Sequence, residues 1–135
     1  MEQPPATTPA PVTVRVNAEP GASPGMIRLV AEITVQPGYH VYAEPVPPGF
    51  TPLAIVVREG AAEQAGPAQW PPPERLVVED FPEEFWVFHG QVTGWVPLRL
   101  TAPPPLVLRG EVVYQACTEF TCFMPAAIPF ELQLS

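Results

Sequence analysis

Hydrophobic and polar residues alternate with a period of two along most of the chain after residue 10. The longest run covers residues 27–35, where Arg28, Glu32 and Thr34 lie opposite a face of Ile, Leu, Ala and Val. Such alternation is typical of β-strands that bury one face. The pattern predicts about nine short strands separated by Pro/Gly turns, which cover residues 12–16, 27–35, 39–42, 53–58, 75–79, 85–89, 92–100, 106–115 and 128–134.

Proline and glycine residues occur along the whole sequence, and their frequency excludes long helices. The chain has 135 residues with 22 Pro and 9 Gly, and each Pro inside a helix costs about 3 kcal/mol. Only residues 61–65, between two glycines, are expected to make a helical turn. Because a two-layer arrangement buries one face of every strand, we predict an all-β, immunoglobulin-like β-sandwich. The Pro-rich residues 1–10 are expected to be a flexible segment, and residues 11–135 a single domain.

The charge balance narrows the class of partners. Fourteen acidic residues and six scattered arginines give a net charge of −8. Nucleic acid or an anionic membrane surface would require a basic patch, so neither is expected. The sequence contains no apolar run of roughly 18 residues that could span a membrane. Because no cleavable signal follows Met1, we expect that an exported protein would be represented here by its mature form.

Two cysteines, Cys117 and Cys122, are the only ones in the chain. They lie between two predicted strands, 106–115 and 128–134, on the connection of a terminal hairpin. A six-residue span with a turn can bring their Cα atoms close enough for a disulfide, and lasting disulfides form outside the cytoplasm. As a structural staple, such a short loop contributes only about 2 kcal/mol. The spacing alone supports a staple and a redox pair equally.

The surroundings of the cysteines indicate which kind of redox role is chemically reasonable. A strongly nucleophilic thiolate needs a helix N-terminus or a nearby cation. The sequence predicts no helix after the pair, has no lysine, and places Glu119 between the two cysteines. A pair of this kind attacks slowly, but a partner's thiolate can still attack its disulfide. We therefore expect a relay that works through protein contact.

Three motifs together resemble a known family. The stretch from Tyr114 to Pro125, YQACTEFTCFMP, resembles the Tyr-Gln-(Gly/Ala)-Cys…Cys-x-x-Pro signature of the N-terminal periplasmic domain of the bacterial thiol:disulfide interchange protein DsbD. Residues 37–46 (PGYHVYAEPV) and 85–93 (FWVFHGQVT) are similar to two further stretches of that family, in the same order. The resemblance covers roughly residues 11–134.

The resemblance implies an immunoglobulin-like fold and a role as a thiol:disulfide oxidoreductase component of the protein-disulfide reductase type, in the bacterial periplasm. Such a domain accepts electrons from a thioredoxin-like donor domain and passes them to exported thiol/disulfide proteins in transient complexes. By this resemblance Cys122 forms the mixed disulfide with partners and Cys117 resolves it. Full-length members also carry a membrane domain and a C-terminal thioredoxin-like domain, which this sequence does not contain. We expect the domain to be a monomer.

The same resemblance implies a cap over the disulfide. In this sequence the cap would be the segment 79–83, with Phe81 as the aromatic shield; the equally supported alternative is that Phe81 fills the edge of the core. Glu79 and Asp80 beside it would raise the thiol pKa by like-charge repulsion if the cap closes; otherwise they are solvated loop charges, which is the default expectation. Other residues expected to line the site are Tyr42, Tyr39, Tyr114, Glu119 and Phe123.

Other chemistries have weaker support. Cys117, Cys122, Met124 and either His40 or His89 offer soft ligands for Cu(I) or zinc, but no metal-binding spacing links the histidines to the cysteines. We therefore expect no metal and no other cofactor. A Ser-His-Asp hydrolase is close to excluded, because the chain has two serines and one Asp. The alternative function is a non-catalytic β-sandwich binding module with a structural disulfide.

Overall fold

The computed structural model describes residues 10–77 and 84–135. Within these ranges the chain forms β-strands and no helix, and no helix is therefore available to cross a membrane. The strands are β1 (Val12–Pro20), β2 (Met26–Val35), β3 (His40–Ala43), β4 (Ala54–Glu59), β5 (Ala62–Gln64), β6 (Glu74–Leu76), β7 (Phe85–Phe88), β8 (Gly90–Leu100), β9 (Leu106–Tyr114), β10 (Ala116–Cys117) and β11 (Ala126–Leu134).

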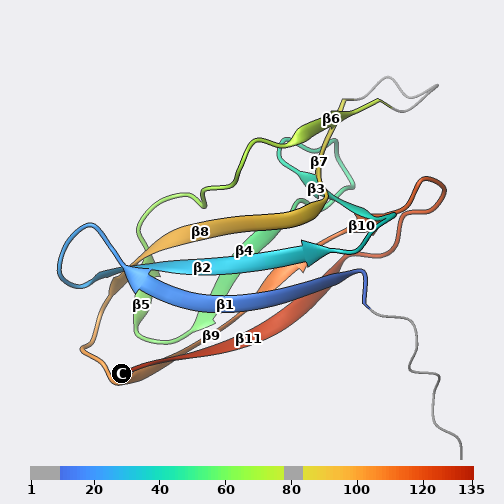
Figure 1. Ribbon diagram of the computed structural model, residues 1–135. Coiled ribbons are helices and arrows are strands. Elements are labelled where there is room, and N and C mark those ends of the chain that lie inside the picture. The colour runs from blue at the N-terminus through green and yellow to red at the C-terminus, as the bar shows by residue number, and fades with distance from the viewer. Residues whose placement is uncertain (1–9, 78–83) are drawn as a thin grey trace, which may run out of the picture.

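The strands form three antiparallel sheets, with orders β1-β2-β8-β5, β11-β9-β4 and β10-β3-β7-β6. The first two sheets are the layers of the sandwich, and the short strands of the third lie at one end, away from the C-terminus (Figure 1). Each of the nine predicted strands overlaps a strand of the structure, the predicted strand 75–79 extending beyond the described residues, and the all-β prediction is confirmed. The domain boundary after residue 10 stays a prediction, with β1 beginning at Val12.

The apolar residues of the alternating runs form the inner faces of the two layers. Leu29 and Ile33 of β2 are fully buried, as are Leu98 of β8 and Leu108 and Val112 of β9. Burying a side chain of this size stabilises the fold by about 1.5–3 kcal/mol. The main core therefore lies between β2 and β8 on one side and β9 on the other.

Two short elements differ from the sequence-based prediction. The helical turn expected over residues 61–65 is wrong, because Ala62–Gln64 form β5 and pair with β8. Ala62 lies opposite Leu100 in that pairing, so ladder hydrogen bonds with a long neighbouring strand override the local helix preference of this segment. The two-residue strand β10 was not predicted, since two residues carry no periodicity. It pairs with β3 and positions Cys117.

Candidate active site

Cys117 and Cys122 form a disulfide that closes a four-residue turn. The backbone N–H of Thr118 donates to the carbonyl of Thr121 at 2.8 Å, and the N–H of Phe123 donates to the carbonyl of Ala116 at 2.9 Å. The Thr118 hydroxyl accepts hydrogen bonds from two backbone N–H groups of the turn, at 3.2 and 3.1 Å. This use of a threonine side chain is a common way to fix a tight turn. The loop therefore holds the two sulfurs at the end of a short hairpin.

The two sulfurs of the disulfide differ in their access to solvent. Cys117 is only 1% exposed and packs in a small cluster with Tyr42, Phe85 and Val87. Cys122 is exposed. Cys122 is therefore the sulfur of the pair that a thiolate from outside the domain can reach.

Tyr42 contacts both sulfurs. Its hydroxyl oxygen lies 3.2 Å from the Sγ of Cys122 and 3.2 Å from the Sγ of Cys117. Because disulfide sulfurs carry no hydrogen, the hydroxyl is the donor. Burial raises the pKa of Tyr42 above its usual value, so the phenol keeps its proton at neutral pH. Its ring is held by Phe50 and Phe85, with centroids 5.1 and 5.5 Å away.

Gln115 connects the cysteine hairpin to a second loop. Its side chain is 8% exposed. Its amide nitrogen donates to the carbonyl of Phe123 at 3.1 Å, and its amide oxygen accepts from the backbone N–H of Thr51 at 2.9 Å. A buried amide with both ends paired fixes the geometry of the groups around it. This is the physical role of the Gln in the Tyr-Gln-Ala-Cys stretch.

The disulfide lies in an open groove of about 1270 Å³. Strands β3, β6, β7 and β10 and the cysteine turn line it, and its ionisable lining includes His40, His89, Glu74, Arg75 and Glu119. Arg75 is paired with Glu84, at 2.9 Å. The groove thus combines a buried aromatic floor with a polar wall.

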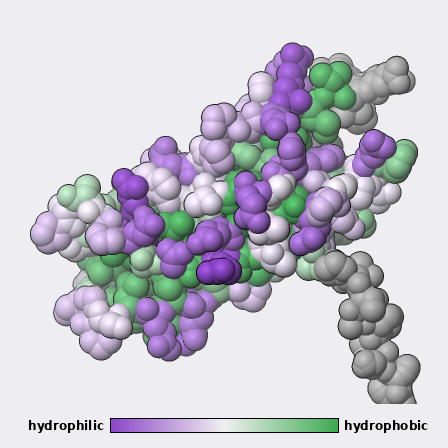
Figure 2. All heavy atoms as spheres, in the orientation of Figure 1, coloured by the Kyte–Doolittle hydropathy of each residue, from purple (hydrophilic) through white to green (hydrophobic). Residues whose placement is uncertain are grey.

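Exposed apolar side chains line the groove and follow Cys122 in the chain. Val77 and Phe120 line it and are 78% and 89% exposed, and Phe123 and Met124, which follow Cys122 directly, are also exposed. Figure 2 shows hydrophobic and hydrophilic atoms side by side at the tip of the loop between β10 and β11. Exposed apolar groups gathered at one place commonly mark a contact surface for another molecule.

The structure brings only some of the sequence-predicted residues to the disulfide. Tyr42 contacts it directly, and Glu119 is an exposed residue of its turn. The ring of Tyr39 lies in the groove wall, 6.1 Å from that of Phe123. Tyr114 is buried in the main core, where burial raises its pKa, and it does not line the groove.

The cap predicted over the disulfide would consist of residues 79–83. Glu79, Asp80 and Phe81 lie outside the described residues, and their roles stay predictions.

Three contributors to the site were not assigned to it from the sequence. They are Phe50 and Phe85, which pack against Tyr42, and Gln115. Phe50 follows a Pro-Pro-Gly turn, and an isolated aromatic residue in a Pro/Gly-rich loop is a signal that could have indicated it. Phe85 gives no such signal, because it belongs to an ordinary strand.

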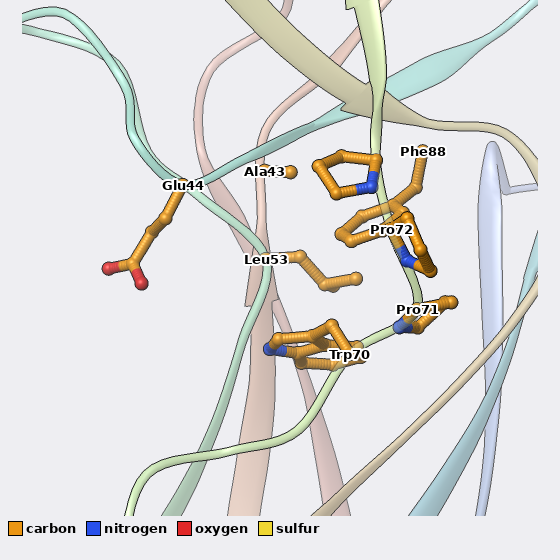
Figure 3. Close-up of a pocket in the computed structure, with 8 residues that line it drawn as sticks. Ala43, Glu44, Leu53, Trp70, Pro71, Pro72 and Phe88 are labelled. Carbon is orange, nitrogen blue, oxygen red and sulfur yellow. The ribbon is translucent and has the colours of Figure 1, made fainter.

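A second cavity, of about 310 Å³, lies away from the disulfide. Trp70, Phe88, Leu53 and the run 71–73 of three prolines line it, and the side chain of Glu44 points away from the rings (Figure 3). Its lining is mostly apolar, and the described residues that form it include no cysteine or histidine. Among the described residues, no three His, Cys, Asp or Glu side chains are arranged to hold a metal ion.

The fold and the site together define a class of protein, a β-sandwich domain that presents one reachable disulfide for thiol–disulfide interchange. The chain belongs to the family of the N-terminal domain of the thiol:disulfide interchange protein DsbD, whose sequence profile matches residues 7–133. No curated protein is similar enough in sequence to count as a match.

Solved structures share the fold at low sequence identity. The N-terminal periplasmic domain of ScsB from Proteus mirabilis has a TM-score of 0.62 at 17% identity, over 91% of this chain and 45% of that chain. The chain thus spans less than half the length of that relative. The Neisseria meningitidis DsbD N-terminal domain in the reduced form has a TM-score of 0.52 at 17% identity, over 87% and 84% of the two chains.

A third similar structure is the complex between the DsbD N-terminal and PilB N-terminal domains from Neisseria meningitidis, with a TM-score of 0.55 at 16% identity over 96% and 85% of the two chains. These likenesses confirm the predicted immunoglobulin-like sandwich.

Proposed function

We propose that the domain is a protein-disulfide reductase component of the bacterial periplasm. It accepts electrons from a thioredoxin-like donor domain at the Cys117–Cys122 disulfide and passes them to exported protein substrates. The observation that carries this proposal is the unequal burial of the two cysteines, with Cys122 exposed in the groove and Cys117 buried against Tyr42.

The exchange follows from this geometry. A donor thiolate attacks the Sγ of Cys122, the disulfide breaks, and Cys117 leaves as a thiolate while a mixed disulfide forms at Cys122. The Tyr42 hydroxyl, 3.2 Å from the leaving sulfur, donates a hydrogen bond to the charge that develops there. The donor's second thiolate then attacks the donor sulfur of the mixed disulfide. This attack releases Cys122, and the donor becomes the disulfide.

The reduced pair passes its electrons on by the same chemistry. The Cys122 thiolate attacks a substrate disulfide and forms a second mixed disulfide. Cys117 then attacks the Sγ of Cys122, the domain's disulfide forms again, and the substrate leaves as a dithiol. Two electrons move in each half of the cycle, and the thiolates take up their protons from water.

The comparisons support the compartment and the type of partner. The ScsB relative is described as periplasmic, and one DsbD N-terminal domain is described in a complex with a PilB N-terminal domain. The exposed apolar residues around the groove, Val77, Phe120, Phe123 and Met124, suit a transient protein contact better than a small-molecule site.

A trapping experiment tests the direction of attack. A thioredoxin-like domain without its resolving cysteine is first converted to its mixed disulfide with 2-nitro-5-thiobenzoate. It is then mixed with the reduced Cys117→Ser or Cys122→Ser variant, whose thiolate displaces the nitrothiobenzoate and forms the disulfide between the two proteins. We expect a covalent complex with Cys117→Ser, because the exposed Cys122 remains, and none with Cys122→Ser. Complex formation through Cys117 alone would contradict the assignment of roles.

A redox titration separates the proposal from the alternative of a binding module with a structural staple. A relay disulfide is expected to equilibrate with thioredoxin-like partners, whereas structural disulfides resist reduction to below about −300 mV. A midpoint below that value would favour the binding module.

A further inference from the structure

The chain's two histidines, His40 and His89, line the same groove as the buried Cys117. Cys117 on β10 is directly opposite His40 on β3, and directly opposed residues of an antiparallel pair have Cβ atoms about 5 Å apart on the same face. On the other side of β3, Val41 pairs with Phe88 of the antiparallel strand β7. His40 precedes Val41 and His89 follows Phe88, so the two histidines come next to this pair along the two chains. Both histidines line the groove.

The two imidazoles have different surroundings. The Nε2 of His89 is 3.0 Å from a carboxylate oxygen of Glu74, and His89 is exposed. Among the described residues, His40 has no carboxylate partner of this kind; it is half-buried, with its ring edge-on to that of Tyr42 at 6.1 Å. Burial, and secondly repulsion from His89, lower the pKa of His40 below 6.5, so its imidazole is neutral at neutral pH.

The ionisable groups around His40 come from every neighbouring element. They are Cys117 and Cys122 with Glu119 in their turn, Tyr39 and Tyr42 beside His40 itself, His89 after β7, and Glu74 and Arg75 on β6. Glu74 is paired with His89, and Arg75 with Glu84. A neutral imidazole beside the cysteine is therefore a free proton acceptor.

The buried cysteine needs such an acceptor when the domain gives up its electrons. Burial disfavours the charged form of a thiol and so raises its pKa, yet only the thiolate attacks a disulfide. Among the described residues, the chain has no helix whose N-terminus could stabilise that thiolate, and Arg75, which lines the groove, is paired with Glu84.

We propose that His40 accepts the proton of the Cys117 thiol in the step that resolves the mixed disulfide, an inference that rests on the proposed function. The thiol proton moves to the imidazole, the Cys117 thiolate attacks the Sγ of Cys122, the intramolecular disulfide forms, and the partner sulfur leaves as a thiolate. The imidazolium then returns its proton to the departing thiolate or to water. No oxidant beyond the mixed disulfide itself is needed.

The resolving step can be measured alone with 5,5′-dithiobis(2-nitrobenzoate) at one equivalent. The reduced domain releases one coloured thiolate when Cys122 forms the mixed disulfide, and a second when Cys117 resolves it. The Cys117→Ser variant marks the first phase, because it has no second one. The second-phase rate is followed from about pH 5 to about pH 9, the range over which a histidine titrates.

With His40 as the acceptor, the wild-type second-phase rate rises up to the pKa of His40 and is then level, since the base is fully neutral. In His40→Gln the rate is expected to fall by about 100-fold near neutral pH, at the low end of general base catalysis. Above neutral pH, the difference between the wild-type and His40→Gln rates shrinks about tenfold for each pH unit, because hydroxide increasingly deprotonates the thiol in the variant.

His89→Gln is the matched control, because it also removes an imidazole from the groove but not the one opposite Cys117. In His89→Gln the second-phase rate should still become independent of pH above the pKa of His40. That pKa should be higher than in the wild type, because the repulsion from His89 that lowers it is gone, so the plateau should begin at a higher pH. His40→Asn serves as a second variant if His40→Gln does not fold, as judged by its urea-unfolding curve.

The possible results separate the two proposals. A wild-type profile in both His40 variants, or a loss that is equal at every pH, would overturn the role of His40. A wild-type domain that shows no second phase would instead contradict the proposed function.

Discussion

Replacing Tyr42 by Phe removes one oxygen atom from the centre of the site. The hydroxyl lies 3.2 Å from both sulfurs, and the ring keeps its contacts with Phe50 and Phe85. The variant should therefore fold normally, with a loss of about 1 kcal/mol or less for a hydrogen bond to an uncharged sulfur. Its effect should appear in the rate of exchange.

The size of that effect follows from the charge on the leaving sulfur. A hydrogen bond to a charged group contributes about 1.5–3 kcal/mol, and sulfur is a weak acceptor, so the low end applies. Up to about 1 kcal/mol of this is already present in the oxidised ground state, and only the difference changes the rate. At about 1.4 kcal/mol for each factor of ten, reduction of Tyr42→Phe should be roughly two- to tenfold slower than that of the wild type. Because burial raises the pKa of Tyr42, the phenol is protonated throughout the neutral range, and the factor should not change between about pH 6 and about pH 9.

The assay is reduction by excess dithiothreitol, stopped with an alkylating agent and read as the mass of the modified chain. Tyr114→Phe is the control, because Tyr114 is also a buried tyrosine with a raised pKa but does not line the groove. Its reduction rate should equal that of the wild type. Equal rates for Tyr42→Phe and the wild type would refute the idea that the hydroxyl stabilises the leaving thiolate.

Three further substitutions test the site from other directions. Replacing Cys117 and Cys122 together by Ser should cost about 2 kcal/mol in the free energy of urea unfolding, since the closed loop is short; failure to fold would favour a structural staple. Gln115→Ala should also cost about 2 kcal/mol, because two part-buried hydrogen bonds of about 1 kcal/mol each are lost; an unchanged unfolding midpoint would show that water replaces the amide. Phe120→Ser should leave the unfolding midpoint unchanged, because Phe120 is 89% exposed, yet reduce the yield of the trapped complex with a thioredoxin-like domain; an equal yield would place the partner elsewhere.

The sequence was sufficient wherever a local pattern repeats or a motif is contiguous. The run Ile27–Val35 alternates for nine residues, and it forms β2, whose buried face includes Leu29 and Ile33. The cysteine hairpin was also predictable, because Cys117 and Cys122 lie between two such runs. In both cases the information lies within a few residues of the chain, where period and spacing can be read directly.

The structure of very short elements could not be predicted from local patterns. Ala62–Gln64 looked helical because alanine, glutamate and glutamine favour helices locally. Its pairing with β8 places Ala62 opposite Leu100, almost 40 residues away along the chain. A three-residue segment has too little periodicity to show this, and its structure depends on the strand it meets.

The chain by itself determined the strands, the absence of long helices and the hairpin that carries the two cysteines, because alternation, proline content and motif spacing are properties of neighbouring residues. Only the tertiary structure decided that Cys122 faces solvent while Cys117 is buried against Tyr42, and that His40 lies directly opposite Cys117. These relations join β3 to a hairpin more than 70 residues further along the chain. They depend on which strands pair and in which register, and a one-residue shift in that register would turn His40 and Tyr42 away from the disulfide.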